Sequence, residues 1–242
     1  MTYTYIRNMA AIGGFLTLLS LVAGGFGELY VPMSVTVATD AAATAEKITS
    51  LNTLFRLGFA AYLIEGLCNV VLIFIFYVLL RPVEKDLAML AAFFGLVGVA
   101  VYAVAELFYL APLLFVGDQP YLSELTLDQR NALALLSLRF YGYAGGVLMA
   151  FGGAGSVIYG YLIFRSRYLP RLLGILLALG GASFIVRNFL LVVAPAYAFD
   201  WLFLPMFLAM AGLGGWLLVR GIDKRLWEDR IGQGDRASAG TA

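Results

Sequence analysis

Six long apolar blocks, separated by short polar connectors, dominate this sequence. A helix needs about 20 apolar residues to cross the roughly 30 Å hydrocarbon core of a bilayer. Barrel strands would alternate between polar and apolar residues, whereas these blocks are continuously apolar. The pattern therefore predicts an all-α polytopic membrane helix bundle with six transmembrane helices. We expect them at approximately Met9–Leu29, Leu57–Leu80, Leu87–Ala111, Phe140–Phe164, Leu172–Ala194 and Trp201–Val219.

The composition excludes a soluble globular domain. Hydrophobic residues make up 62% of the chain and charged residues 13%, against averages of about 45–50% and 25% in soluble domains. We expect one transmembrane domain over residues 1–225 and a flexible tail over residues 226–242, because the stretch from Gly232 onward has no apolar periodicity.

Basic residues predict the orientation, since Lys and Arg gather in the cytoplasmic loops of membrane proteins. One side of the expected bundle carries Arg7, Arg81, Lys85, Arg165, Arg167, Arg171, Arg220, Lys224, Arg225, Arg230 and Arg236. The other side carries Lys47, Arg56, Arg130 and Arg139. Both termini are therefore expected in the cytoplasm. The basic clusters also fit contact with anionic lipids better than binding of nucleic acid.

Features that recur along the chain are consistent with a helix hairpin used three times. Spans one, three and five each follow a basic residue and end near a proline, at Pro32, Pro112 and Pro195. This match indicates that the first span is kept and is not a cleaved signal peptide. The simpler alternative is that each inward-to-outward span needs a basic flank and a helix breaker in any case.

Two connectors on the less basic side are long enough to form helices. Asp40 is suited to cap a helix, and apolar residues recur at helical steps from Ala41 to Arg56, which predicts an interfacial amphipathic helix. Thr126 and Gln129 fit a capping box that leads into the fourth span. We interpret both segments as surface structure and not as binding sites.

Small residues line one face of the fourth span, which predicts close helix packing. They are Gly142, Gly146, Ala150, Gly153, Ser156 and Gly160. We expect this helix to be central. The packing partner is either a helix of the same chain, which we favour, or a second copy.

Polar and ionisable side chains within or beside the spans form the candidate site. They are Glu28, Arg56, Glu65, Asn69, Glu106, Arg139, Arg187 and Asn188. At 1.5 Å per residue, all of the charged members fall in the half of the bilayer farther from the termini. A charge at the bilayer centre costs about 2.5–3.5 kcal/mol or more, so each is expected to be paired.

We expect Glu65 to pair with Arg187, because both lie roughly 12–14 Å deep. Glu28 and Glu106 fall near the level of Arg56 and Arg139. Two interpretations follow. In the first, three acids and three arginines neutralise one another and fix helix register. In the second, they line an outward-facing cavity for a small or amphipathic ligand, with Tyr62, Tyr102 and Tyr109 as aromatic walls.

Missing residue types argue against most enzyme chemistry. The chain has no His and only one Cys, Cys68, which excludes the commonest general base and the usual zinc and haem sites. No glycine-rich phosphate loop follows a strand. We expect no catalytic residue, no metal and no cofactor.

Several local motifs together resemble one family. They are the run from Asp40 to Ala45, the Leu54-Phe-Arg-Leu-Gly58 entry to span two, the Tyr77-Val-Leu-Leu-Arg-Pro-Val83 exit, and the Tyr161-Leu-Ile-Phe-Arg165 and Leu169-Pro-Arg-Leu-Leu-Gly174 segments. The chain is similar over about Ile6–Asp223 to the bacterial membrane proteins of domain of unknown function 4386. The resemblance implies a multi-span protein of the bacterial inner membrane and supplies no functional residues.

The sequence thus predicts a non-enzymatic membrane scaffold or partner-binding protein whose charged cluster is structural. The alternative is a binder or transporter of a small or amphipathic ligand, through a cavity lined by Glu65, Arg187, Glu106 and Arg139. Membrane lipids are the expected partners, and self-association through the fourth helix is the less favoured option.

Overall fold

The computed structural model describes residues 2–117 and 120–239, with side chains described up to residue 232. Within these residues the chain is helical and has no strand. The longer helices are α1 (Tyr3–Gly24), α4 (Asn52–Leu80), α5 (Lys85–Leu110), α7 (Leu127–Ser166), α8 (Arg171–Val193) and α9 (Leu204–Val219). Short helices are α2 (Val31–Val35), α3 (Ala41–Ser50), α6 (Pro112–Phe115) and the C-terminal α10 (Lys224–Ala239).

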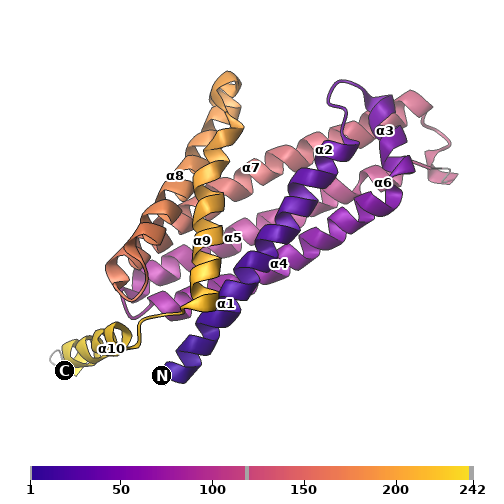
Figure 1. The fold of residues 1–242 in the computed structure, drawn as a ribbon. Helices are drawn as coiled ribbons and strands as arrows, with labels where there is room; N and C mark the ends of the chain where they lie inside the picture. Colours follow the sequence, from indigo (N-terminus) through magenta and orange to yellow (C-terminus); the bar gives the residue numbers. More distant parts are fainter. Residues whose placement is uncertain (1, 118–119, 240–242) are drawn as a thin grey trace.

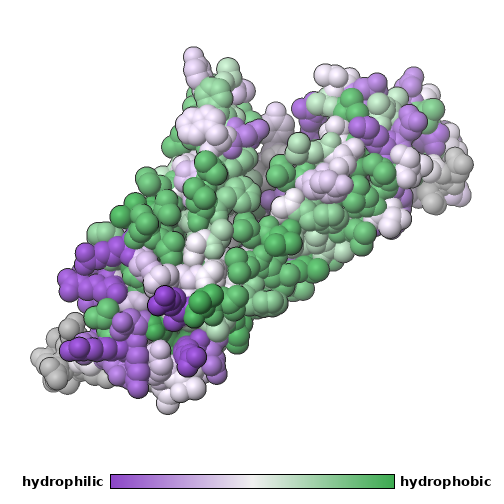
Figure 2. Space-filling model, in the orientation of Figure 1, coloured by the Kyte–Doolittle hydropathy of each residue, from purple (hydrophilic) through white to green (hydrophobic). Residues whose placement is uncertain are grey.

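Six helical stretches in the described residues are long and apolar enough to cross a membrane, which confirms the predicted fold class. They are Tyr3–Val35, Asn52–Leu80, Lys85–Phe115, Leu127–Ser166, Arg171–Val193 and Asp200–Val219. Hydrophobic residues cover the middle of the face in Figure 2, and hydrophilic residues gather towards two opposite ends. This distribution matches a bilayer-spanning bundle.

The spans pack in chain order. Each one contacts the next, from α1 to α4, α5, α7, α8 and α9, and α9 packs back onto α1. Both termini lie at one end of the bundle, which we call the termini end, and α2, α3 and α6 lie at the other, which we call the far end (Figure 1). The tips of α8 and α9 diverge from α2 and α3, leaving a notch that is visible in Figure 2.

Close glycine contacts hold neighbouring helices together in the termini half. A Cβ on Gly160 of α7 would lie 2.5 Å from the Gly174 carbonyl oxygen in α8, and a Cβ on Gly153 would lie 2.6 Å from the Gly181 carbonyl oxygen. The predicted small-residue face of α7 thus packs against α8 of the same chain. On its other side α7 packs against α5, which is consistent with a central position.

The predicted helix caps are present, but one helix is shorter than expected. Asp40 accepts a hydrogen bond from the Ala43 amide at 2.9 Å, and Thr126 and Gln129 form a capping box. The interfacial helix predicted over Ala41–Arg56 ends at Ser50, because Leu51 leaves the helical conformation. Residues from Asn52 belong to α4, so Arg56 lies in a membrane-spanning helix and not in the interfacial one.

At the C-terminus, α10 occupies residues 224–239, where the sequence predicts a flexible tail from residue 226. Asp223 accepts a hydrogen bond from the Leu226 amide at 3.0 Å, and Trp227 is only 2% exposed. Burial raises the pKa of the nearby Tyr168 hydroxyl, although Arg230 opposes the shift. Tyr168 therefore stays protonated and donates to the Leu79 carbonyl at 2.6 Å. The buried Trp227 lies five residues before Gly232 and is an apolar contact of α10 with the rest of the chain.

Candidate functional site

Three glutamates and four tyrosines gather in the far half of the bundle, on four different helical segments. We call them the acid–tyrosine site. Its members are Glu28, Tyr62, Glu65, Tyr102, Glu106, Tyr109 and Tyr141. The tyrosines belong to the apolar core of the far half or pack directly against it.

Glu28 reaches this site from an irregular part of the first span. Residues Gly25–Tyr30 form a π-helical segment, η1, between α1 and α2. An extra residue per turn changes the direction in which the following side chains point, and such segments occur often at functional sites. Glu28 lies within this segment and is half-buried, so its position depends on a local feature that hydropathy does not reveal.

Helices α4 and α5 supply most of the side chains of the site, because residues three or four apart lie on the same face of a helix. Tyr62 and Glu65 are three residues apart on α4, while Tyr102 and Glu106 are four apart on α5, so each pair shares a helix face. The Tyr102 hydroxyl donates to Glu65 Oε2 at 2.9 Å and also contacts the Glu28 carboxyl group. Tyr102 therefore links two of the acids.

The three carboxyl groups lie within electrostatic range of one another. Glu65 interacts with both Glu28 and Glu106, and Glu106 interacts with Glu28. Glu106 is only 4% exposed. In the described residues the ion pairs are Arg187 with Asp200 and Lys224 with Glu228, so neither involves these three acids. Within the described part of the chain, the site thus collects acidic groups that have no ion pair with a basic side chain.

Four tyrosine rings form one wall of the site. The ring centroid of Tyr62 lies 5.8 Å from that of Tyr102, 4.8 Å from that of Tyr109 and 5.6 Å from that of Tyr141, each in an edge-to-face arrangement. The hydroxyl groups of Tyr62 and Tyr141 are hydrogen-bonded to each other. Tyr141 on α7 was not among the aromatic residues predicted for the site, although it immediately follows the fourth expected span's first residue, Phe140.

Gly24 leaves space that the Glu65 carboxyl group occupies. A Cβ on Gly24 would lie 2.7 Å from Glu65 Oε2, closer than side-chain carbons normally approach. On the side towards the bundle centre, Asn69 interacts with Glu65 and accepts a hydrogen bond from the Ser20 hydroxyl at 3.1 Å. Asn69 therefore borders the acid–tyrosine site through Glu65.

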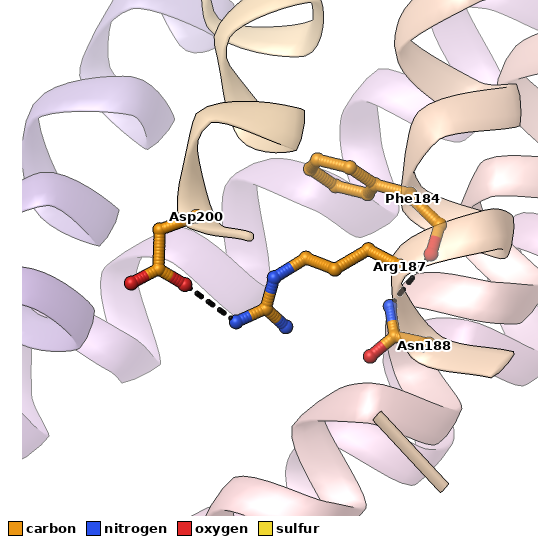
Figure 3. Close-up of polar contacts among 4 residues, drawn as sticks. All are labelled: Phe184, Arg187, Asn188 and Asp200. Atoms are coloured by element: carbon orange, nitrogen blue, oxygen red, sulfur yellow. Dashed lines mark hydrogen bonds and ion pairs between the residues drawn. The ribbon is translucent and has the colours of Figure 1, made fainter. Parts of the chain in front are cut away.

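The predicted pair between Glu65 and Arg187 is wrong. Arg187 Nη2 instead lies 2.7 Å from Asp200 Oδ1 (Figure 3). Its guanidinium carbon also lies 4.1 Å from the centroid of the Phe203 ring. Asp200 belongs to a 3₁₀ turn, Asp200–Phe203, that leads into α9. It was overlooked because it stands just outside the expected sixth span, one residue before Trp201.

The arginines at the far end also have partners other than the acids. Arg56 is exposed, and its Nε donates to the Asn52 side chain at 2.7 Å. Arg139 is exposed, and its Nη2 donates to the Ala38 carbonyl at 2.6 Å, joining α7 to the loop before α3. The expected network in which three arginines neutralise three glutamates is therefore not formed, because similar depth in the bilayer does not place side chains on facing helix surfaces.

Asn188 lies beside Arg187 but serves the contact between α8 and α7. Its Nδ2 donates to the Phe184 carbonyl at 2.8 Å (Figure 3), and its buried Oδ1 has no hydrogen-bond partner among the residues that the structure describes. A Cβ on Gly146 would lie 2.8 Å from this oxygen. The predicted cluster thus divides into the acid–tyrosine site with Asn69, a separate group around Arg187 and Asn188, and two peripheral arginines.

The arrangement of side chains limits the chemistry of the acid–tyrosine site. Among the described residues, no group of three or more His, Cys, Asp or Glu side chains could hold a metal ion. What the site offers is carboxyl groups beside aromatic rings. Carboxylates attract cations through charge, and the faces of tyrosine rings attract them through their quadrupole.

Fold and site together define a polytopic α-helical membrane protein with a polar site embedded in one half of the bundle. The family described as Domain of unknown function (DUF4386) matches residues 12–221. The chain therefore belongs to this family, as its motifs indicated. No curated protein and no solved structure matches the chain.

Proposed function

We propose that this protein binds an organic cation with an apolar portion, held at the acid–tyrosine site. The observation that carries the proposal is the gathering of Glu28, Glu65 and Glu106 without a paired basic side chain in the described part of the chain. Burying acidic groups without a counter-charge is unfavourable. A bound cation would relieve that cost, and it would also contact the tyrosine rings.

The chemistry of the surroundings favours an amphipathic ligand. The tyrosines adjoin apolar side chains such as Val31, Ile48 and Phe55, which are fully buried. Glu28 and Glu65 are half-buried, so part of each remains reachable. An ammonium or phosphonium group could lie between the acids while its hydrocarbon substituents pack against this apolar surface or extend into lipid.

The sequence alternative was a small or amphipathic ligand in a cavity lined by both acids and arginines. The ligand proposed here is instead a cation, bound by acids. The scaffold function depended on acids and arginines that neutralise one another, and the observed partners of the arginines remove that support. Arg187 pairs with Asp200 and does not line a cavity with Glu65. The charged side chains of the acid–tyrosine site are therefore all acidic. A cationic ligand then fits better than an anionic or neutral one.

The test compares two probes of matched shape and opposite charge, tetraphenylphosphonium and tetraphenylborate, on the full chain purified in a nonionic detergent. We expect saturable binding of the phosphonium only. Glu65→Gln should weaken it about 10- to 100-fold, because a hydrogen bond or contact with a charged group contributes about 1.5–3 kcal/mol. Equilibrium dialysis measures both probes directly.

Glu46→Gln is the matched control, because Glu46 is an exposed acid on α3 at the same end of the bundle. Its phosphonium affinity should equal that of the unmodified chain. The proposal fails if the phosphonium shows no saturable binding, if tetraphenylborate binds equally well, or if the two Glu→Gln variants behave alike.

We further propose that the protein lies in a bacterial inner membrane with its termini end in the cytoplasm, so that the site faces the periplasmic leaflet. The basic residues at the termini end support this orientation. In a Cys68→Ser background, a cysteine at Ser123 should react with a membrane-impermeant maleimide on intact cells. A cysteine at Gly232 should react only after lysis, and the reverse pattern would contradict the orientation.

A further inference from the structure

Two acids of the acid–tyrosine site share one hydroxyl group. The Tyr102 hydroxyl donates to Glu65 Oε2 at 2.9 Å and also contacts the Glu28 carboxyl group. A tyrosine hydroxyl has a single proton to donate, although its oxygen also accepts. It therefore donates to one carboxylate only. The second carboxyl group bonds to the same oxygen when it carries a proton of its own.

The other tyrosine hydroxyls of the site bond elsewhere. Tyr62 and Tyr141 bond to each other, and Tyr109 donates to the Phe55 carbonyl at 3.3 Å. Glu106 is 4% exposed, and in the described part of the chain its carboxyl group has neither a hydrogen-bond partner nor an ion-pair partner. A buried carboxyl group without a donor or a counter-charge is unfavourable as an anion.

The groups that the structure describes around the three acids include no basic side chain. They come from α4, α5 and α7, and each is a hydroxyl, a thiol or an amide. They are Tyr62, Cys68 and Asn69 on α4, Tyr102 on α5 and Tyr141 on α7. Carboxyl groups within electrostatic range of one another do not all ionise together. The charge balance of the site therefore requires either a bound cation or a proton.

We propose that Glu28 and Glu65 share one proton across the Tyr102 hydroxyl and release it when a cation binds, so that the site exchanges a proton for its ligand. This inference rests on the proposed function and adds a proton to the binding reaction. The O–H bond of the protonated acid breaks, the proton passes to water, and a monovalent cation takes its place beside the two carboxylates. The net charge of the site stays the same, and the proton belongs to the coupled pair and not to either acid alone.

Phosphonium binding at different pH values tests the exchange, on the full chain in a nonionic detergent. Because the proton competes with the cation, the affinity for tetraphenylphosphonium should rise with pH, by about tenfold per pH unit for one proton per ligand. We expect this rise between about pH 6 and pH 7, where exposed Asp and Glu side chains stay ionised. The chain has no His, which is the side chain that ordinarily titrates there. A pH indicator in weakly buffered solution should record about one proton released per phosphonium bound.

Glu28→Gln is the variant that separates binding from exchange. Its amide donates to the Tyr102 oxygen as a protonated acid does, but it has no proton to release. Phosphonium binding should weaken and remain measurable through Glu65, and the remaining affinity should not change over the same pH range. Glu46→Gln, at the exposed acid on α3, should keep both the pH dependence and the proton release.

Dicyclohexylcarbodiimide tests the proton without the phosphonium. A protonated carboxyl group adds to this apolar reagent, its proton moves to a reagent nitrogen, and no atom leaves, so mass spectrometry locates the adduct. At about pH 7, where ordinary acids are ionised, Glu28 or Glu65 should be labelled and Glu46 should not. The labelling should fall at higher pH and in the presence of tetraphenylphosphonium.

Saturable phosphonium binding with an affinity that does not change with pH would overturn the exchange and leave the binding function standing. Absence of the label from both Glu28 and Glu65, or a loss of pH dependence in Glu46→Gln, would also overturn the exchange. Absence of saturable binding at every pH would overturn the binding function and the exchange together.

Discussion

The two halves of this bundle are held together by different interactions. The termini half has a continuous apolar core that includes Ile75, Leu162 and Leu213, with helices in close contact at glycines. The far half has a core rich in tyrosine, with carboxyl groups hydrogen-bonded or adjacent to the rings. The termini half depends on the fit of apolar side chains and backbones, whereas the far half depends in addition on hydrogen bonds between tyrosine and carboxyl groups.

This difference suggests a division of roles. The termini half gives the bundle a rigid base, because backbones in contact leave little freedom to shift. The far half keeps acidic groups that a purely structural core would replace with apolar residues of similar volume. Substitutions in the two halves should therefore differ in the size and the cause of their effect on the free energy of unfolding.

The largest effect is expected from Gly160→Leu in the termini half. Its Cβ would lie 2.5 Å from the Gly174 carbonyl oxygen and 2.6 Å from the Ala178 amide nitrogen, so α7 and α8 must separate. We expect a loss of about 3 kcal/mol in the free energy of unfolding, the upper part of the usual range for overpacking. Titration with sodium dodecyl sulfate in mixed micelles measures it.

Gly142→Leu on the same helix is the control, because nothing lies within 4 Å of a Cβ at that position. Its effect should stay within about 0.5 kcal/mol. Equal losses in the two variants would show that the glycine contact between α7 and α8 does not hold the termini half together.

A smaller effect is expected from Tyr102→Phe in the far half. The change removes the hydroxyl that donates to Glu65 and leaves a half-buried carboxyl group with one donor fewer. Loss of one partner from a buried polar group costs about 1–3 kcal/mol. Tyr143→Phe, at a position that is 61% exposed on α7, should be neutral by the same titration. A neutral Tyr102→Phe would mean that the hydroxyl does not support the acid.

The smallest loss of the three is expected from Asp200→Ala. Its carboxylate pairs with Arg187 at 2.7 Å, but the Asp200 side chain is 85% exposed. Exposed ion pairs contribute about 0–1 kcal/mol, and stacking on Phe203 still holds the guanidinium. Thermal unfolding at low and at high salt measures the effect. A loss of 2 kcal/mol or more would show that this pair is shielded from solvent.

The sequence predicts features of single helices better than contacts between helices, for a physical reason. Hydropathy and spacing depend on one helix at a time, so the spans, the caps at Asp40 and Thr126 and the packing face of α7 follow directly. Pairing between helices depends in addition on rotation about each axis. The π-helical segment around Glu28 changes that rotation, and equal depth placed Glu65 beside Arg187 when they lie on surfaces that do not meet.

Two residues missed at the sequence level were nevertheless recognisable in principle. Asp200 stands directly before the sixth span, so an acid for Arg187 was available within one turn of the boundary. Tyr141 lies inside the predicted fourth span, one residue after Phe140, so its type and position were both available. Considering the residues within one helical turn beyond each apolar block would have included Asp200, and considering every tyrosine within the blocks would have included Tyr141.

The central claim is that the glutamates of the far half form one site to which Arg187 does not belong. A double-mutant cycle on the free energy of unfolding, with Glu65→Gln and Arg187→Gln alone and combined, tests it most directly. We predict a coupling within about 0.5 kcal/mol, as for independent sites, while a parallel cycle between Glu65 and Tyr102 gives a clear coupling. A coupling of 1 kcal/mol or more between Glu65 and Arg187 would contradict the account.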